Sequence, residues 1–331
     1  MKMGTNILRT CAGACLALCS ISAFALGTVT VTSPSTGDFV GSSTTIRFNI
    51  AGATVAVKVK VTVSKVGGGP STNLPEQTVT PDSNGVGSGQ VTWAPGTSFP
   101  EGDYDVVVNS TEGGVPLPST ALVVTLDRKK PELTTFAPTG GSFIKGTVNI
   151  SATILEVNLD NWRVTVNGED LPNNTGATNT VAVSWDTTDI VNDGSQSIAI
   201  IIKDKANNEK TVNINVTLDR AAPTVQINNP RVNQQIRPGS TMGVIVDITD
   251  ASASSVDIMA IQVEIQKLDG TFIKRVSRSR FASQGSGVRW QGTVRVTLPS
   301  GVTEFKVVVR VFDKAGNGPV IQEVQVRLGQ G

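Results

Sequence analysis

The chain has 331 residues, a formal net charge of +1, three cysteines and no histidine. Its length is typical of two or three domains. Without histidine, Ser-His-Asp triads and Cys-His dyads are excluded, and the usual zinc and copper sites lose their main ligand. The near-neutral charge provides no general attraction for polyanions, so we expect no nucleic-acid partner.

The first 25 residues have the pattern of a secretory signal peptide. Lys2 and Arg9 make a basic start, residues 11–24 are apolar, and an Ala-Phe-Ala sequence ending at Ala25 supplies a cleavage signal. We therefore predict cleavage after Ala25 and an exported protein. The apolar run is short for a membrane span, and no later stretch approaches the ~20 apolar residues that a transmembrane helix needs.

All three cysteines, Cys11, Cys15 and Cys19, lie in this leader, so the mature chain is expected to contain no disulfide. Lipoprotein processing is the alternative, in which one cysteine becomes the lipidated first residue. Leu18 before Cys19 is bulkier than that processing favours, and the apolar run before Cys15 is short. Cleavage after Ala25 is the preferred interpretation.

Apolar and polar residues alternate along much of the remaining chain. Valines occupy every odd position from Val55 to Val63, with lysines and a threonine between them in its second half. A period of two predicts a strand with one buried and one exposed face. The pattern recurs at 122–126, 212–218, 305–311 and 324–328, and no segment of ten residues has a helical period. The sequence therefore predicts an almost entirely β protein.

A repeated phrase divides the chain into units. Leu126-Asp127-Arg128 returns as Leu218-Asp219-Arg220, and Trp93 returns as Trp185, both at an offset of 92 residues. A third unit has its tryptophan at Trp290. After the leader at 1–25, we predict domains at 26–127, 128–219 and 220–331. The second unit is shorter before its tryptophan, which predicts that it lacks one loop or pair of strands.

The second and third units share a turn motif, Asp204-Lys205-Ala206-Asn207-Asn208 and Asp313-Lys314-Ala315-Gly316-Asn317. Asn and Gly accept the positive φ that a tight hairpin connection requires, and the leading aspartate can accept hydrogen bonds from the amides that follow. We therefore predict a tight turn at each motif.

Together with the following strand, these segments resemble the bacterial immunoglobulin-like repeats of exported proteins. The resemblance is strongest over VSWDTTDIVNDGSQSIAIIIKDKANNEKTVNINVTLDRAAP and FKVVVRVFDKAGN. It implies three tandem immunoglobulin-like β-sandwich domains, each with a core of aliphatic residues and tryptophan. The chain departs from the family where a tyrosine is common two residues after a glycine: the first unit has Tyr104, but the second has Gln196. Such a family specifies a fold rather than one activity.

Calcium is the metal that the composition allows. The domain seams are poor candidates, because Asp127 and Asp219 stand next to basic residues, whereas calcium requires six to eight oxygen ligands. Turn or capping roles are the alternative for every aspartate in the two better clusters. These weak candidates are Asp186, Asp189 and Asp193 in the second unit, and Asp247, Asp250 and Asp257 in the third.

One run of basic residues is a candidate ligand site in the third unit. It comprises Lys274, Arg275, Arg278 and Arg280, and strand alternation would place Arg278 and Arg280 on one face. Such a stripe would suit an acidic polysaccharide or a lipid headgroup. The alternative is that the charges keep an edge strand soluble. Trp162, which lies outside the repeat, is expected in the core; an exposed Trp162 would instead favour a sugar-stacking platform.

These observations predict a non-enzymatic, exported structural, spacer or adhesive module at the cell surface or in the envelope. Its partner would be a protein or a glycan, with no transmembrane segment in the mature chain and no cofactor beyond possible calcium. The first alternative is a carbohydrate-binding or polyanion-binding secreted protein. The second is an accessory part of a secreted enzyme system. A secreted enzyme with an unrecognised site is the remaining alternative, which a deep pocket lined with shifted carboxylates would favour.

Overall fold

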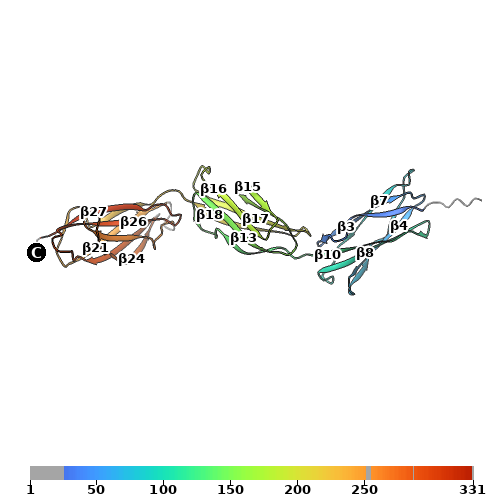
Figure 1. The fold of residues 1–331 in the computed structure, drawn as a ribbon, viewed down its shortest axis with the longest axis horizontal. Coiled ribbons are helices and arrows are strands. Elements are labelled where there is room, and N and C mark those ends of the chain that lie inside the picture. Colours follow the sequence, from blue (N-terminus) through green and yellow to red (C-terminus); the bar gives the residue numbers. More distant parts are fainter. Residues whose placement is uncertain (1–25, 251–254, 286, 330–331) are drawn as a thin grey trace, which may run out of the picture. The chain divides into compact units, whose positions relative to one another are not determined.

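The structure is a computed structural model that describes residues 26–250, 255–285 and 287–329. The expected leader at 1–25, with all three cysteines, lies outside the described residues. In the described ranges the chain folds into strands and turns, and they include no helix that is long and apolar enough to cross a membrane. The chain divides into two compact units, Met1–Arg128 and Lys129–Gly331, the second of which contains two of the three predicted repeats. From here on, "unit" means one of these two parts, and each repeat is called a sandwich. Figure 1 shows the strands of each part.

The first unit is a two-sheet sandwich. One sheet has the strand order β1-β3-β7, and the other has the order β2-β10-β8-β4-β5, with β6 paired to β4 and β9 paired to β8. Its strands are β1 (Thr28–Ser33), β2 (Phe39–Val40), β3 (Thr44–Ala51), β4 (Val57–Lys65), β5 (Ser71–Asn73), β6 (Gln77–Val79), β7 (Gly87–Trp93), β8 (Gly102–Glu112), β9 (Val115–Pro116) and β10 (Thr120–Leu126).

The second unit begins with a similar sandwich, whose sheets have the orders β11-β13-β16 and β12-β18-β17-β14-β15. Its strands are β11 (Glu132–Ala137), β12 (Phe143–Ile144), β13 (Thr147–Leu155), β14 (Leu159–Val166), β15 (Glu169–Gly176), β16 (Thr180–Asp186), β17 (Gly194–Asp204) and β18 (Glu209–Leu218). The chain passes directly from β15 to β16. This sandwich therefore lacks the extra strand that the others have before the tryptophan, as its shorter sequence predicts.

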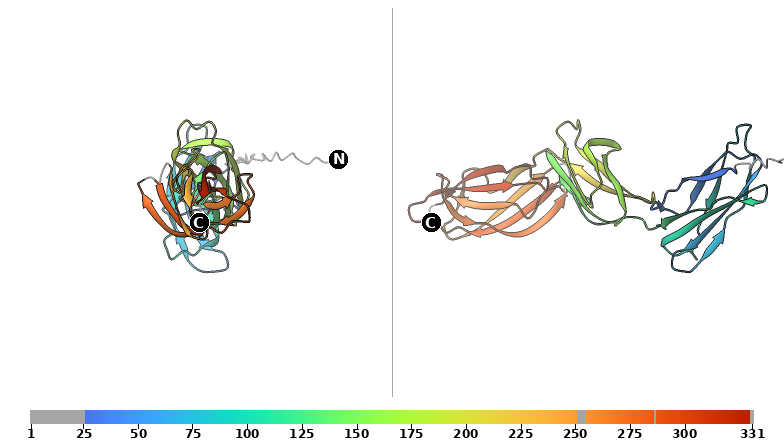
Figure 2. Two further views of the ribbon diagram at one scale, coloured as in Figure 1. Left: turned by 90° about the vertical axis from the view of Figure 1, so that its left-hand side faces the viewer. Right: turned by 45° about the vertical axis from the view of Figure 1, so that its right-hand side comes forward.

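The last sandwich has sheets with the orders β19-β21-β25-β24 and β20-β27-β26-β22-β23. Its strands are β19 (Thr224–Asn229), β20 (Gln234–Ile236), β21 (Thr241–Thr249), β22 (Gln262–Gln266), β23 (Phe272–Arg275), β24 (Ser277–Gln284), β25 (Gly287–Arg295), β26 (Glu304–Val311) and β27 (Val320–Leu328). The ribbons in Figure 2 show the layered strands of the sandwiches from two further directions.

All three sandwiches share the connectivity of their central strands. In each, the first strand, the strand after the short second strand and the strand that carries the core tryptophan form one sheet (β1-β3-β7, β11-β13-β16 and β19-β21-β25, with β24 added at the edge of the last), and the short second strand runs parallel to the last strand of the other sheet, as β2 does with β10, β12 with β18 and β20 with β27. This is the strand arrangement of an immunoglobulin-like sandwich, with strands A, B and E facing A′, G, F, C and C′. The predicted fold class is confirmed, whereas the predicted domain boundaries at 26–127, 128–219 and 220–331 stay a prediction.

Alternation builds the cores as expected. In β4 the side chains of Val57, Val59, Val61 and Val63 are buried, and the residues between them are wholly or partly exposed. Val55 continues this pattern in the sequence but lies outside the strand and is exposed. The backbone there leaves the sheet to make contacts in a loop, which the alternation could not show.

Each core is centred on a buried tryptophan. Trp93, Trp185 and Trp290 are at most 3% exposed. Trp162 is also buried, with its Nε1 donating to the Thr178 carbonyl at 2.9 Å, so the core role expected for it is confirmed. A Cβ at Gly176 would overlap the Trp162 ring, so the neighbouring strand requires a glycine there.

The position that departs from the family pattern is filled differently in each sandwich. Tyr104 is buried against Trp93, and its hydroxyl donates to the Pro100 carbonyl at 2.7 Å. Gln196 replaces it in the second sandwich and accepts a hydrogen bond from Asn167 at 2.6 Å. In the third, Phe305 pairs with Val326 as Tyr104 pairs with Val124. The fold therefore tolerates a polar or an apolar solution at this position.

Candidate functional site

Three carboxylates from distant parts of the chain meet in the second unit. They belong to Asp219 after β18, Asp250 after β21 and Asp313 after β26. One oxygen of each lies within 4.8 Å of the others, and within the described ranges this is the only such group of three or more potential metal ligands. Asp219 and Asp313 are each 2% exposed, and Asp250 is partly buried. We call these three residues the carboxylate cluster.

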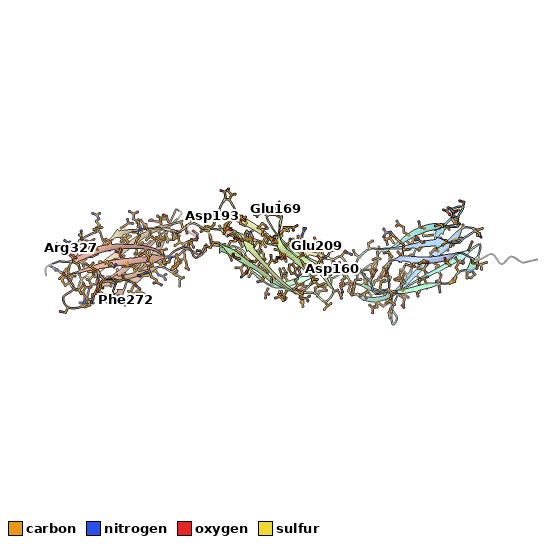
Figure 3. All side chains as sticks on the ribbon, turned by 45° about the horizontal axis from the view of Figure 1, so that its top comes forward. Asp160, Glu169, Asp193, Glu209, Phe272 and Arg327 are labelled. Carbon is orange, nitrogen blue, oxygen red and sulfur yellow. The ribbon has the colours of Figure 1, made fainter. Side chains whose placement is uncertain are left out.

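Asp219 is placed by the end of the second sandwich. Leu218 is buried in that sandwich, and the Asp219 amide donates to the Ile144 carbonyl at 2.9 Å. Arg220 does not pair with Asp219: its backbone amide and its Nε bind Asp193 at 2.7 and 2.6 Å. Figure 3 labels Asp193 at one end of this sandwich and Glu209 toward the opposite end. The arginine at this seam therefore pairs with Asp193 and not with Asp219.

The same pairing of a seam arginine with an acidic side chain of its own sandwich occurs in the first unit. The Arg128 amide and Nε bind Glu101 at 2.9 and 2.8 Å, and Nη2 donates to the Phe99 carbonyl at 2.6 Å. In both copies the repeated Leu-Asp-Arg phrase buries its leucine and folds its arginine back onto its own sandwich. The basic residue next to Asp219 is therefore turned away from it, so the adjacent charge that made this seam a poor calcium candidate does not reach Asp219. Whether the seam binds calcium stays a prediction.

Asp313 is held by the turn that the sequence predicts. The Asn317 amide donates to Asp313 Oδ1 at 2.7 Å, and its Nδ2 donates to Oδ2 at 2.6 Å. The equivalent turn has the same bonds between Asn208 and Asp204, both at 2.8 Å. Asn207 has the positive φ, 67°, that such a turn requires. The aspartate at the head of each motif is therefore a preorganised part of its turn.

Asn317 also joins the two sandwiches of the second unit. Its Nδ2 group is shared with the carbonyls of Asp219 at 2.9 Å and Ala221 at 3.0 Å. Its Oδ1 accepts a hydrogen bond from Lys145 Nζ at 3.0 Å, and that ammonium also binds the Gly316 carbonyl at 2.6 Å. One amide side chain thus fixes the seam backbone, the turn and a lysine of the preceding sandwich.

Burial and repulsion between like charges disfavour the ionised form of Asp219 in the carboxylate cluster. Burial raises the pKa of Asp219 to about 6, and the charges of Asp250 and Asp313 add to the shift. The Oδ2 atom of Asp219 is buried and has no hydrogen-bond partner. Its Oδ1 accepts only one long bond, from the Ala221 amide at 3.3 Å. Buried carboxylate oxygens are normally paired, so this atom requires an explanation.

Most of the calcium candidates from the sequence are used in other ways. Asp186 accepts from the Thr188 amide at 2.9 Å, and Asp193 binds Arg220. Asp247 is paired with Arg289 through bonds of 2.6 and 2.7 Å, and Asp257 accepts from the Met259 amide at 3.0 Å.

Asp189 is exposed, and of the six candidates only Asp250 joins the carboxylate cluster. The calcium roles of the other five stay predictions.

The basic run does not form one strand. Lys274 and Arg275 end β23 at the edge of one sheet, while Arg278 and Arg280 lie on β24 at the edge of the other. The pairing shifts between Arg278 and Arg280, which interrupts the alternation expected to place them on one face.

Two of these residues also have partners within the sandwich. Arg275 Nη2 lies 3.3 Å from Glu264 Oε1, and Arg278 lies over the Phe281 ring at 4.5 Å. Arg275, Arg278 and the exposed Met259 line an open groove of about 510 Å³ beside Trp290. The ligand role of the basic run stays a prediction.

The class that the strand order defines is a tandem immunoglobulin-like repeat protein. No protein-family model matches the chain, and no curated protein matches it. Among solved structures it is similar to the fibronectin(III)-like modules of Clostridium thermocellum CbhA. The identity is 12% and the TM-score 0.39, covering 60% of this chain and 94% of that one.

Two further structures match over most of both chains. The I9–I11 tandem of titin is 10% identical, with a TM-score of 0.28, and the match covers 92% of this chain and 100% of that one. A structure of a 1.5-MDa bacterial ice-binding adhesin is 16% identical, with a TM-score of 0.28 and coverages of 92% and 98%. At these values the likeness carries no argument about activity or partner, and the fold assignment rests on the strand order.

Proposed function

We propose that the protein is a non-enzymatic, exported structural module that acts as a spacer or adhesive array at the cell surface or in the envelope. The observation that carries the proposal is the hydrogen-bonded seam between the last two sandwiches. The carbonyls of Asp219 and Ala221 are held by Asn317 of the following sandwich. A linker tied to the domain after it limits interdomain motion, as a spacer requires.

The proline at the seam supports the same role. Pro223 follows Ala221 and Ala222 directly before β19 and is buried. Proline has a fixed φ angle, so it reduces the number of backbone conformations that a short linker can adopt. Asn317 binds the seam backbone, and Lys145 of the preceding sandwich binds Gly316 and Asn317, so the turn of the third sandwich is tied to both the seam and the second sandwich. We infer that binding, if adhesive, takes place at loops and sheet edges away from the seam.

The mechanical part of the proposal can be tested at Asn317. We expect Asn317→Ala to increase the independent tumbling of the last two sandwiches in nitrogen-15 relaxation measurements on the full chain. The matched control is Asn208→Ala, which removes the same turn bonds from the second sandwich but leaves the Asp219 and Ala221 carbonyls bonded. Equal tumbling of both variants and the unaltered chain would overturn a spacer role for this seam.

The cellular part needs a separate experiment. Fractionation of cells that produce the protein is expected to recover it outside the cytoplasm, with residues 1–25 removed. Crosslinking before fractionation would then identify the nearest surface protein or glycan. Recovery of an uncleaved chain in the cytoplasm would contradict export, whatever the tumbling measurements give.

A second candidate function, binding of an anionic glycan, is favoured by the groove in the third sandwich. Its lining combines the arginines Arg275 and Arg278 with the exposed side chain of Met259, which is 80% accessible. Apolar surface beside guanidinium groups suits a sulfated or uronic sugar. Retention on a heparin column that disappears in Arg278→Glu but not in Arg295→Glu would support it, and equal retention would contradict it.

A further inference from the structure

We propose that the carboxylate cluster of Asp219, Asp250 and Asp313 binds a divalent cation, with calcium as the preferred ion. The site goes beyond the spacer function and does not depend on it; only its mechanical consequence rests on that function. Three observations support the site, namely the buried Asp219 atom that lacks a partner, the lack of a protein cation paired with Asp219 or Asp313 in the described ranges, and the oxygen chemistry of the ligands; the origin of the ligands in two sandwiches gives the site its consequence.

The first step is the state of Asp219. The residue is 2% exposed, its Oδ2 atom makes no hydrogen bond, and a carboxylate oxygen of Asp219 lies within 4.8 Å of those of Asp250 and Asp313. A buried carboxylate with one long hydrogen bond carries a large desolvation cost, and two more acidic groups beside it add repulsion. The turn role of Asp313 does not account for this arrangement, because the bonds from Asn317 satisfy Asp313 without Asp219 or Asp250. A cation at the centre of the cluster would remove both costs.

The second step is that Asp219 and Asp313 are not neutralised by a basic side chain in the described ranges. Neither Asp219 nor Asp313 forms a salt bridge with a lysine or arginine among the residues that the structure describes. Arg220 binds Asp193, and Lys145 binds the Gly316 carbonyl and Asn317. Lys314, next to Asp313, lies over the Phe143 ring at 5.7 Å. The nearest basic side chains are thus engaged with other groups.

The third step is the ligand chemistry. The cluster offers only oxygen atoms, from three carboxylates that can each bind through one or two oxygens. Calcium accepts six to eight such ligands in flexible geometry, completed by carbonyls and water, whereas magnesium requires a tighter octahedron and keeps more of its water. Three carboxylates also provide the high charge that calcium sites share. With no histidine in the chain, the softer metals that prefer nitrogen lose their usual ligand.

The origin of the ligands gives the site its consequence. Asp219 ends the second sandwich, whereas Asp250 and Asp313 belong to the third. A bound cation would therefore join the two sandwiches beside the Asn317 bonds to the seam carbonyls. If the spacer function is correct, calcium stiffens this seam; if it is not, the cation still binds and stabilises the fold.

The test is calorimetric titration of calcium chloride into the full chain after treatment with EDTA. We expect saturable binding, with an affinity at least tenfold above that for magnesium. Asp219→Asn and Asp313→Asn should each lower the calcium affinity at least tenfold. The control Asp269→Asn removes another turn aspartate of the third sandwich, one that accepts from the Thr271 amide, and should leave binding unchanged.

A thermal scan keeps the result interpretable if a variant is poorly folded. In EDTA, Asp219→Asn should melt no lower than the unaltered chain, because it removes a charge from the cluster. In calcium, the unaltered chain should gain several degrees and the variant little. Absence of saturable calcium binding, or a calcium response that survives Asp219→Asn, would overturn the site. Calcium binding without a change in interdomain tumbling would leave the site standing and remove its mechanical role.

Discussion

Two buried carboxylates in this chain, Glu112 and Asp219, have nearly the same exposure and opposite environments. Glu112 is 3% exposed and accepts from the amides of Gly27, Thr54 and Val55 at 2.7, 2.5 and 3.3 Å. These bonds, led by that from Gly27, lower its pKa to about 2. Asp219 is 2% exposed, its Oδ2 atom has no partner, and its pKa is raised to about 6.

The difference shows what burial alone does not. The hydrogen bonds of Glu112 are satisfied within the first unit, because Gly27, directly before β1, and the loop before β4 supply its donors. Asp219 has its charge placed beside two others, with one weak donor. The number of hydrogen-bond donors, rather than the exposed fraction, distinguishes a carboxylate with a structural role from one that is available to bind a ligand.

The largest expected effect is the loss of a core side chain in the second sandwich. It gives the free energy of unfolding against which the two carboxylate substitutions can be compared. Trp185 is 3% exposed at the centre of that core. We expect Trp185→Ala to lower the free energy of unfolding by ~3 to 5 kcal/mol. Urea unfolding followed by hydrogen exchange in β13 and β16 measures it, and a loss below ~1 kcal/mol would mean that the ring is not part of the core.

Removal of Glu112 is expected to rank next. Glu112→Ala leaves the buried Gly27 amide and the loop amides without their acceptor, so we expect a loss of about 3 kcal/mol in the first unit. Hydrogen exchange should rise in β1 and β3 while the strands of the second unit stay protected. If the loss appeared equally in both units, the carboxylate would not be the local structural group described above.

The sequence predicted the strands, the tryptophan cores and the turn at Asp313 because each depends on neighbours in the chain. The carboxylate cluster depends instead on three strand ends that the fold brings together. Asp219 also stood next to Arg220, and no local pattern indicated that this arginine turns to Asp193.

Glu112 was missed for a similar reason: its donors come from Gly27 and Thr54, which are distant in sequence. Spacing within one segment cannot reveal either arrangement. The bulge between Arg278 and Arg280 was hidden in the same way, because an extra residue in one strand is seen only against its partner.

Asp219 should respond to substitution in the opposite direction from Glu112. In EDTA, Asp219→Asn keeps an Oδ1 acceptor for Ala221 and removes one charge of the cluster, so we expect a gain of about 1 to 2 kcal/mol. Urea unfolding of the second unit without metal measures this change. A loss of the size expected at Glu112 would show that Asp219 is also a satisfied structural group, and the contrast between the two carboxylates would fail.

The smallest expected effect is the acid response of the first unit. The pKa of Glu112 falls from 4.5 in the unfolded chain to about 2 in the fold, so its ionised form stabilises the fold fully above pH 4.5. That contribution is lost as the pH falls from 4.5 through 2, because both states then bind the proton. Glu112→Gln, which keeps one acceptor oxygen, should therefore cost about 1 kcal/mol at pH 6.

The same substitution should cost progressively less at lower pH. Other carboxylates titrate in this window, and the difference between the two chains isolates Glu112 because they share every other group. Hydrogen exchange in β1 at pH 6 and pH 2.5 provides the measurement. A cost that stays constant across this range would mean that the Gly27 and Thr54 amides do not favour the charged form, and the contrast with Asp219 would then rest on geometry alone.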